Sequence, residues 1–118
     1  MNIRKFTHKT GQLFAALGNP FRIKILLAIG AGEACVCHLE SVLNQRQAYI
    51  SQHLMALRKA GLLDTRRAGK YIFYRLADPA TFELIRSAGQ LAGLPEAQLP
   101  KLGATGTDPD CDCPKCVE

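Results

Sequence analysis

The sequence predicts a mostly α-helical domain that carries one small β-hairpin. Two observations lead to this fold class. Apolar residues recur with a helical period as far as about residue 60, and between Leu63 and Leu76 the chain becomes rich in β-branched and aromatic residues around the turn "RRAGK". The chain has 118 residues, which suits one domain, and a chain this short often relies on a partner subunit for its stability.

The first two predicted helices are separated by the dipeptide Asn19-Pro20. Asparagine caps free N–H groups and proline suits the first helical position, so a mostly buried helix begins here and ends at Gly30 and Gly32. The preceding helix, residues 3–17, has an apolar stripe that suits a dimer interface as well as the core. This stripe consists of Phe6, Leu13, Phe14 and Leu17.

Two further helices are predicted on either side of the polar turn "NQRQ". The first is short and covers residues 35–43, and the second ends at Gly61 after two basic residues that suit a helix C-terminus. The residues expected to face inward on the short helix are Leu39, Val42 and Leu43. Those expected on the longer helix are Ile50, Leu54 and Leu57, which recur at i, i+4 and i+7.

The hairpin and a last helix complete the predicted domain. The strands cover about residues 63–66 and 70–76, and the helix "DPATFELIRSAGQLAG" has Pro79 near its first turn. From residue 94 the composition turns to Pro, Gly, Thr and Asp, which predicts a domain over residues 1–93 and a flexible tail over residues 94–118. Two helices around a tight turn, followed by a basic hairpin, indicate a winged helix-turn-helix.

The helix after "NQRQ" has a polar N-terminal half that suits contact with DNA bases. The candidate contact residues are Gln47, Ser51, Gln52 and His53. The hairpin tip adds the long cations Arg66, Arg67 and Lys70, which suit phosphates or a narrow minor groove. Taken alone, the polar helix half could be a solvated helix face and the basic tip an ordinary surface turn. The order and spacing of the two features together favour DNA binding.

The overall composition agrees with a nucleic-acid partner and excludes other classes. Lys and Arg number 15 against 10 Asp and Glu, with a pI near 9.1. No apolar stretch approaches the roughly 20 residues of a membrane span, and the first 12 residues lack the apolar core of a signal peptide. We therefore expect a cytoplasmic protein without a membrane partner. No Ser/His/Asp arrangement, phosphate loop or carboxylate pair predicts an enzyme.

Cys35 and Cys37 are expected to be thiols, because disulfides are rare in the cytoplasm. On a regular helix the two side chains point about 200° apart, but a first turn that loosens towards an extended conformation allows both to hold one ion. Thiolates select soft ions such as As(III), Cd(II), Pb(II), Zn(II) and Cu(I). The alternative is that both are small buried apolar residues.

Three more cysteines lie in the predicted tail. Cys111, Cys113 and Cys116 form a C-x-C-x2-C pattern in a segment with no apolar core, so packing does not account for them. They are candidate ligands of a thiophilic ion. The alternative is a reactive or metal-scavenging end of the chain.

The segment from Leu13 to Leu76 resembles the ArsR/SmtB family of metalloregulatory repressors. "ALGNPFR", "SQHL", "AGL" and "YRL" are general marks of this family, and the pattern E-x-C-V-C-x-L is found in members that sense thiophilic ions. The resemblance implies a homodimeric winged-helix repressor that binds operator DNA without any cofactor. It also implies that the repressor leaves the operator when the ion binds, which derepresses a resistance operon.

The resemblance also implies roles for individual residues. The ion ligands would be Cys35 and Cys37, the DNA-reading helix would present Ser51, Gln52 and His53, and the wing would contribute Arg67 and Lys70. The first and last helices would form the dimer interface. Three positions depart from the family pattern: Ala34 replaces the usual leucine, His38 the usual aspartate, and Glu40 the third cysteine of many arsenic sensors. The last helix lacks histidine, so a zinc site there is not expected.

We expect the tail to supply the missing thiolates, with one or two of its three cysteines joining Cys35 and Cys37. As(III) is favoured because three thiolates suit its coordination, and Cd(II) or Pb(II) are the alternatives. His38 is a weaker candidate ligand, and an exposed helix residue is the favoured interpretation of this position. Two other hypotheses stay open: a repressor that senses oxidants through cysteine, and a metal carrier or oxidoreductase that uses the tail.

Overall fold

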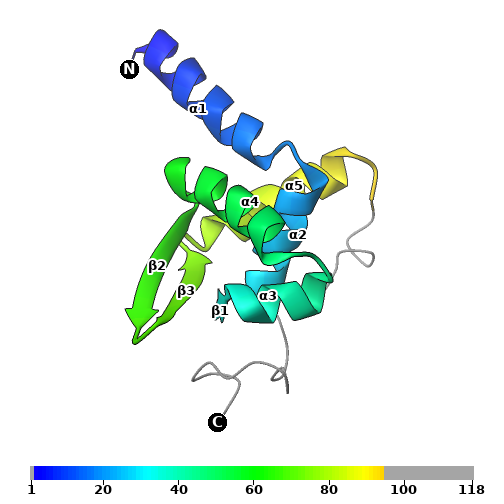
Figure 1. Cartoon of the computed structure of the whole chain (residues 1–118). Helices are drawn as coiled ribbons and strands as arrows, with labels where there is room; N and C mark the ends of the chain where they lie inside the picture. Colours follow the sequence, from blue (N-terminus) through cyan, green and yellow to red (C-terminus); the bar gives the residue numbers. More distant parts are fainter. Residues whose placement is uncertain (1, 95–118) are drawn as a thin grey trace.

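The computed structural model describes residues 2–94, which form five helices and a three-stranded antiparallel sheet (Figure 1). The helices are α1 (Ile3–Leu17), α2 (Pro20–Ile29), α3 (Val36–Leu43), α4 (Gln47–Lys59) and α5 (Ala80–Leu91). The strands are β1 (Glu33–Cys35), β2 (Leu63–Ala68) and β3 (Tyr71–Leu76). The mostly helical winged helix-turn-helix class predicted from the sequence is confirmed. The three cysteines of the tail lie outside the described residues.

The hydrophobic core lies between α2, α3 and α4. Its fully buried members there are Ile25, Leu26, Leu39, Ile50, Leu54 and Leu57. The helical period predicted for α4 is therefore confirmed. Val42 was expected in the core but is exposed, because α3 contacts the core along the edge that carries Leu39 and Leu43.

Helix α1 projects away from the rest of the domain (Figure 1). It meets α2 at a bend of 84°, and only its last turn is buried, at Ala16 and Leu17. Half of its apolar stripe is exposed, at Phe6 and Phe14, whereas Leu13 is half-buried and Leu17 is buried. Within residues 2–94 no single helix is long and apolar enough to cross a membrane, and α1 and α2 reach that length only together, across their bend.

Strand β1 is an element that the sequence analysis did not predict. Cys35 was expected inside a helix, but its backbone is extended, with φ −83° and ψ 164°, and α3 begins one residue later. The sheet order is β1-β3-β2, with Cys35 directly opposite Phe73. Three residues are too few to show an alternating pattern, so β1 arises from pairing with the edge of β3.

The hairpin of β2 and β3 is longer than predicted. Its strands reach Ala68 and begin again at Tyr71, so that a two-residue turn, Gly69-Lys70, connects them. Gly69 has φ +63°, and glycine favours this conformation at the first position of a tight hairpin turn. Lys70, predicted as the first residue of the strand, therefore lies in the turn.

Asn19 caps α2, as predicted, and its loss should destabilise the domain. Its Oδ1 accepts hydrogen bonds from the backbone N–H groups of Phe21, at 2.8 Å, and Arg22, at 3.3 Å. Asn19→Ala is expected to lower the free energy of unfolding by about 1 kcal/mol, measured by urea denaturation at fixed protein concentration. Asn2→Ala is the control, because Asn2 caps the exposed start of α1. An equal loss of unfolding free energy in Asn2→Ala would contradict the expectation that the cap of α2 contributes more than the cap of α1.

Candidate DNA interface and thiol pair

The turn between α3 and α4 sets the geometry of the helix-turn-helix. Asn44 ends α3 in the left-handed conformation, with φ 53° and ψ 49°. Asparagine is one of the few residues that adopt this conformation readily, because its short side chain can bond locally. The polar segment "NQRQ" is thus a sharp turn, as predicted, and α4 begins at Gln47.

Three of the four candidate base contacts lie on or beside the exposed face of α4. Gln47 and Gln52 are exposed, and Ser51 is half-buried beside them. The opposite face carries the apolar residues of the core. Gln47 is also in the first turn of the helix, where N–H groups without helical partners and the positive end of the helix dipole favour phosphates.

His53, the fourth candidate, turns towards α2 instead. Its exposure is 7%, and its Nδ1 accepts a hydrogen bond from Arg22 Nε at 3.1 Å. Arg22 Nη1 also donates to the carbonyl oxygen of Ala16 at 3.2 Å, so one guanidinium joins α1, α2 and α4. Burial, and secondly the Arg22 charge, lower the pKa of His53 below its ordinary value of 6.5. The ring is therefore neutral at pH 7.

Aromatic contacts complete the attachment of α4 to α2. Phe21 and Tyr49 have ring centroids 4.9 Å apart, and His53 lies 5.3 Å from Phe21 and 4.7 Å from Tyr49. Such distances are typical of favourable tilted and edge-to-face pairs. The N-terminal half of α4 is consequently held by packing that the sequence analysis did not recognise.

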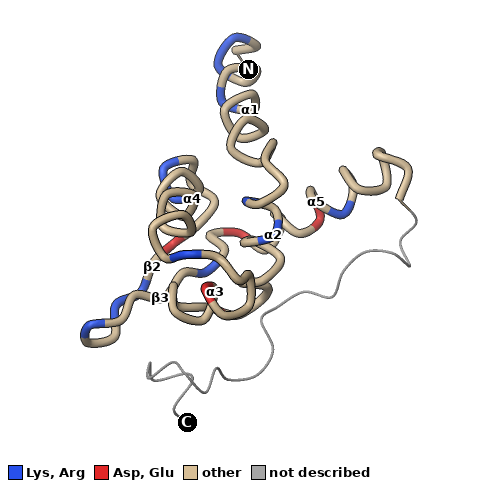
Figure 2. The backbone as a smooth tube through the Cα atoms, turned by 45° about the vertical axis from the view of Figure 1, so that its right-hand side comes forward, with Lys and Arg blue, Asp and Glu red and all other residues tan. Residues whose placement is uncertain are grey.

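The hairpin, which we call the wing (residues 63–76), carries cations in two different situations. Arg66 forms an ion pair with Glu33, and its guanidinium lies 4.8 Å from the centre of the Phe73 ring. Arg67 and Lys70 are exposed at the tip, where Lys70 Nζ lies 5.4 Å from the centre of the Tyr71 ring. Figure 2 shows these basic residues gathered at the end of the hairpin. Arg67 and Lys70 are thus available to a polyanion.

The domain is more basic than the whole chain. Residues 2–94 contain thirteen of the 15 Lys and Arg residues but only five of the ten Asp and Glu residues. Besides the wing, basic residues lie at both ends of α4, at Arg46, Arg58 and Lys59 (Figure 2). A surface of this charge attracts DNA at long range.

The two cysteines meet at the junction of β1 and α3. Cys35 is the last residue of β1, Cys37 lies in the first turn of α3, and their sulfurs are joined in a disulfide with the Cα atoms 5.4 Å apart. The expectation of two thiols is therefore corrected. The extended backbone that lets both sulfurs meet was also expected, and it is present at Cys35. The His38 N–H donates to Cys35 Sγ at 3.4 Å. His38 itself is buried, so the expectation of an exposed residue is wrong.

The described residues provide two sulfur ligands but not a complete ion site. Among residues 2–94, no group of three or more His, Cys, Asp or Glu side chains is placed to hold a metal ion. Reduction of the disulfide yields two adjacent thiols, and their thiolates suit a soft ion. Further ligands would have to come from Cys111, Cys113 and Cys116 or from another molecule.

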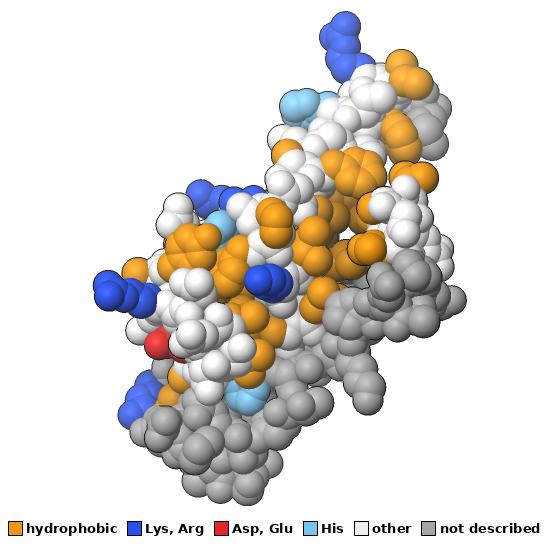
Figure 3. All heavy atoms as spheres, turned by 90° about the vertical axis from the view of Figure 1, so that its right-hand side faces the viewer, with side chains coloured by type: hydrophobic (Ala, Val, Ile, Leu, Met, Phe, Trp, Pro, Cys, Tyr) orange, Lys and Arg blue, Asp and Glu red, His pale blue; other side chains and the backbone are white. Residues whose placement is uncertain are grey.

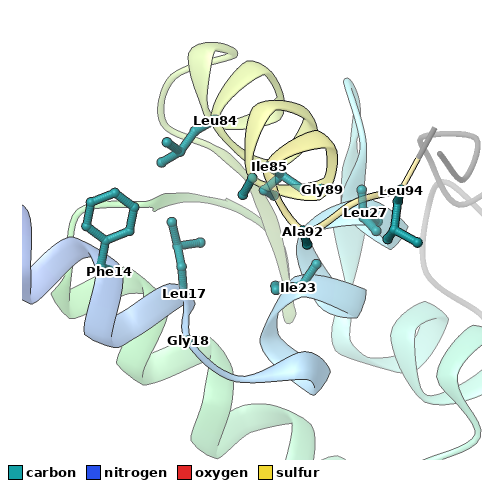
Figure 4. A pocket seen from close by; sticks show the side chains of 11 residues that line it. Phe14, Leu17, Gly18, Ile23, Leu27, Leu84, Ile85, Gly89, Ala92 and Leu94 are labelled. Atoms are coloured by element: carbon teal, nitrogen blue, oxygen red, sulfur yellow. The ribbon is translucent and has the colours of Figure 1, made fainter. Parts of the chain in front are cut away.

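An apolar groove of about 480 Å³ lies between α1, α2 and α5. Figure 4 shows Phe14 and Leu17 of α1 on one side and Leu84 and Ile85 of α5 on the other. Hydrophobic side chains also gather on this face of the molecule in the space-filling view (Figure 3). Exposed apolar surfaces of this kind are found where a protein contacts a partner or a ligand.

Comparison with known proteins identifies the family. Residues 19–65, which span α2 to the start of β2, match the model of the bacterial regulatory protein arsR family. The transcriptional repressor SmtB of Mycobacterium tuberculosis is 36% identical over 90 residues, which cover 76% of this chain and 67% of that protein. The arsenical resistance operon repressor of Escherichia coli is 46% identical over 67 residues, which cover 56% and 57%.

A solved structure agrees with the sequence matches. The homodimeric winged helix-turn-helix DNA-binding domain Mb0332 of Mycobacterium bovis, described as a possible ArsR-family regulator, superimposes with a TM-score of 0.69 at 26% identity. The match covers 79% of this chain and 88% of that domain. The prediction that the chain is no enzyme is confirmed, because the family consists of regulators. This chain belongs to the ArsR/SmtB family of winged helix-turn-helix transcriptional regulators.

Proposed function

We propose that this protein is a homodimeric cytoplasmic repressor that leaves its operator when Cys35 and Cys37 ligate a thiophilic ion. The observation that carries the proposal is the position of the two sulfurs. They meet at the first turn of α3, the helix that directly precedes the DNA-reading helix α4. A change at the sulfurs therefore acts on the element that sets the angle of α4.

The proposed operator contacts come from α4 and the wing. Gln47, Ser51 and Gln52 reach base edges, because amide and hydroxyl groups can pair with donors and acceptors in the major groove. Arg67 and Lys70 neutralise phosphates beside the groove. His53 contributes indirectly by holding α4 against α2, because its ring is buried against Arg22 and Phe21.

The proposed ion is As(III), with Cd(II) or Pb(II) as alternatives. Cys35 and Cys37 supply two thiolates once the disulfide is reduced, and one of Cys111, Cys113 and Cys116 supplies a third. Thiolate ligands select soft ions over oxygen-preferring ones. Support also comes from the likeness to a repressor of arsenical resistance.

The proposed dimer uses the groove between α1 and α5. Phe14 of α1 lines the groove opposite Leu84 and Ile85 of α5, and Phe6 of α1 is also exposed. A two-fold partner would cover this surface and would present two copies of α4 to successive major grooves. The homodimeric state of the similar domain from Mycobacterium bovis supports this arrangement.

Release follows from a difference in ion affinity between two conformations. If ligation suits the conformation that fits DNA poorly, it shifts the population away from the operator by that difference alone. Coupling free energies of this kind are about 1–3 kcal/mol. The two sulfurs lie at the start of α3, the helix that directly precedes α4. A change at the sulfurs can therefore produce a coupling free energy of this size.

A second candidate function is a redox-sensing repressor, which the Cys35–Cys37 disulfide favours. In that case oxidation of the two thiols, rather than ligation, would change the first turn of α3. Reversal by a reductant without any chelator distinguishes the two functions.

The test is operator binding, followed by fluorescence anisotropy, of the reduced protein with arsenite, Cd(II), Pb(II) or Zn(II). Arsenite is expected to weaken wild-type binding by roughly tenfold or more, the scale of the coupling above. Cys35→Ser is expected to stay bound. A variant with serine at all three tail cysteines keeps the charge and length of the tail, and it is also expected to stay bound.

Three outcomes would revise the proposal. Release of the tail variant at the wild-type arsenite concentration would exclude the tail cysteines as ligands. Release by Cd(II) or Pb(II) but not by arsenite would select the alternative ion. Release by peroxide alone, reversed by a reductant, would establish the redox candidate.

A further inference from the structure

Strand β1 places Cys35, one of the two paired cysteines, in the same sheet as the wing. Cys35 lies opposite Phe73 of β3, and Phe73 lies opposite Arg66 of β2, so the three residues form one row across the three strands. Residues directly opposite each other in antiparallel strands point to the same face of the sheet. Cys35 and Phe73 pack together as a buried cluster, with Cys37 and Tyr71 against it.

A second contact joins the ends of this row. Glu33, two residues before Cys35, accepts hydrogen bonds from Arg66 Nε at 3.2 and 3.1 Å, one to each carboxylate oxygen, and Arg66 Nη2 also donates to Oε1. The Arg66 guanidinium rests above the Phe73 ring. A forked pair of this kind fixes both direction and distance, unlike an ordinary surface ion pair.

The row is buried at Cys35 and Phe73 and reaches the surface at Arg66. Phe73 is fully buried, and the Glu33 side chain retains only 16% exposure while that of Arg66 retains 47%. Closely packed side chains transmit strain, whereas a flexible surface contact absorbs it. Glu33 and Phe73 are therefore the residues that position a wing cation with respect to Cys35.

We propose that the wing reports the state of the Cys35–Cys37 pair through this row, with Glu33 as the positioning residue that holds Arg66. The inference rests on the proposed function, because it names the route by which ligation at the thiols reaches the DNA. It adds a second route to the direct effect of α3 on α4.

The physical reason is the position of Cys35 at the end of β1. Reduction frees the two sulfurs, and a shared ion then fixes their separation at a value longer than a disulfide bond. Ligation therefore constrains β1, the first turn of α3, or both. A displacement of β1 shifts Phe73 through their pairing and shifts Arg66 through Glu33. The cations at the wing tip, on the same hairpin, then lose their alignment with the phosphates.

The test compares Glu33→Gln with Asp64→Asn in the full-length protein. Asp64 shares the sheet face and the cross-strand row of Glu33, opposite Arg75, so both variants remove one negative charge from the same row. Each variant is titrated with arsenite, and binding is followed by the charge-transfer absorbance of the thiolate–arsenic bonds. Operator affinity is then measured with and without the ion. In Asp64→Asn, the ratio of the operator affinity without arsenite to that with arsenite is expected to equal the wild-type ratio.

Glu33→Gln is expected to bind arsenite with the wild-type stoichiometry but to lose most of the release. A wild-type ratio of roughly tenfold, the scale of a typical coupling, should fall to about twofold. A wild-type ratio in Glu33→Gln would overturn the inference and leave the proposed function intact. Arsenite that binds the wild type without weakening its operator affinity would contradict the proposed function instead.

Hydrogen exchange of the DNA-free protein tests the route independently of operator release. Arsenite binding is expected to change the exchange of backbone amides in β2 and β3 of the wild type and of Asp64→Asn. The change should be several-fold smaller in Glu33→Gln. Unchanged exchange in both strands of the wild type, with arsenite bound, would overturn the inference.

Discussion

Leu54→Ala is expected to lower the free energy of unfolding by about 2–5 kcal/mol. Leu54 has 0% exposure and lies between Ile50 and Leu57 on the core face of α4. Its truncation removes buried apolar surface and leaves a cavity that closely packed neighbours fill only in part. Urea denaturation followed by circular dichroism measures the loss, at fixed protein concentration because the proposed dimerisation would contribute to stability.

Met55→Ala provides the control for this prediction. Met55 is the next residue of the same helix but is 58% exposed. Its replacement should change the free energy of unfolding by no more than about 0.5 kcal/mol. Similar losses for the two variants would mean that α4 does not bury the face that the structure assigns to the core.

Arg22→Ala is expected to lower the free energy of unfolding by about 1–3 kcal/mol, the cost of leaving buried polar groups without their partner. The substitution removes the donor to His53 Nδ1 and one donor to the Ala16 carbonyl oxygen. Operator affinity should fall as well, because the first half of α4 loses a contact that fixes its position. The neighbouring cation Lys24 is exposed, and Lys24→Ala, the matched control in charge, should leave stability nearly unchanged.

The same contact predicts a pH dependence of stability. The pKa of His53 in the folded protein is below its unfolded value of 6.5, chiefly through burial and secondly through the Arg22 charge. The unfolded chain therefore binds more protons between these two pKa values. The contribution of the neutral ring to stability is complete above about pH 6.5 and is lost as the pH falls through the folded pKa.

Comparison of the wild type with His53→Gln isolates this effect. Glutamine keeps a hydrogen-bond acceptor but does not titrate, and both proteins retain His8 and His38. The free energy of unfolding of the wild type should fall more steeply than that of His53→Gln between pH 7 and pH 5. Parallel curves would show that His53 is not held neutral by its surroundings.

Much of the fold is encoded in short segments of the chain. Asn19-Pro20 predicts the start of α2, because capping involves only the next two or three residues. The recurrence of Ile50, Leu54 and Leu57 predicts α4 and its buried face from the helical period alone. The spacing of Cys35 and Cys37 likewise shows that two sulfurs need an extended position to meet, which the structure has at Cys35.

The tertiary structure decided the features that depend on distant partners. The three-residue strand β1 has no period of its own and exists because it pairs with β3, about 40 residues later in the chain. His53 is polar and looked suited to DNA, but Arg22, 31 residues earlier, bonds its ring in the interior. By itself the sequence determined the helices and the hairpin, because these depend on neighbouring residues. Packing between distant segments decided which polar side chains of α4 are exposed and placed Cys35 in the same sheet as the wing.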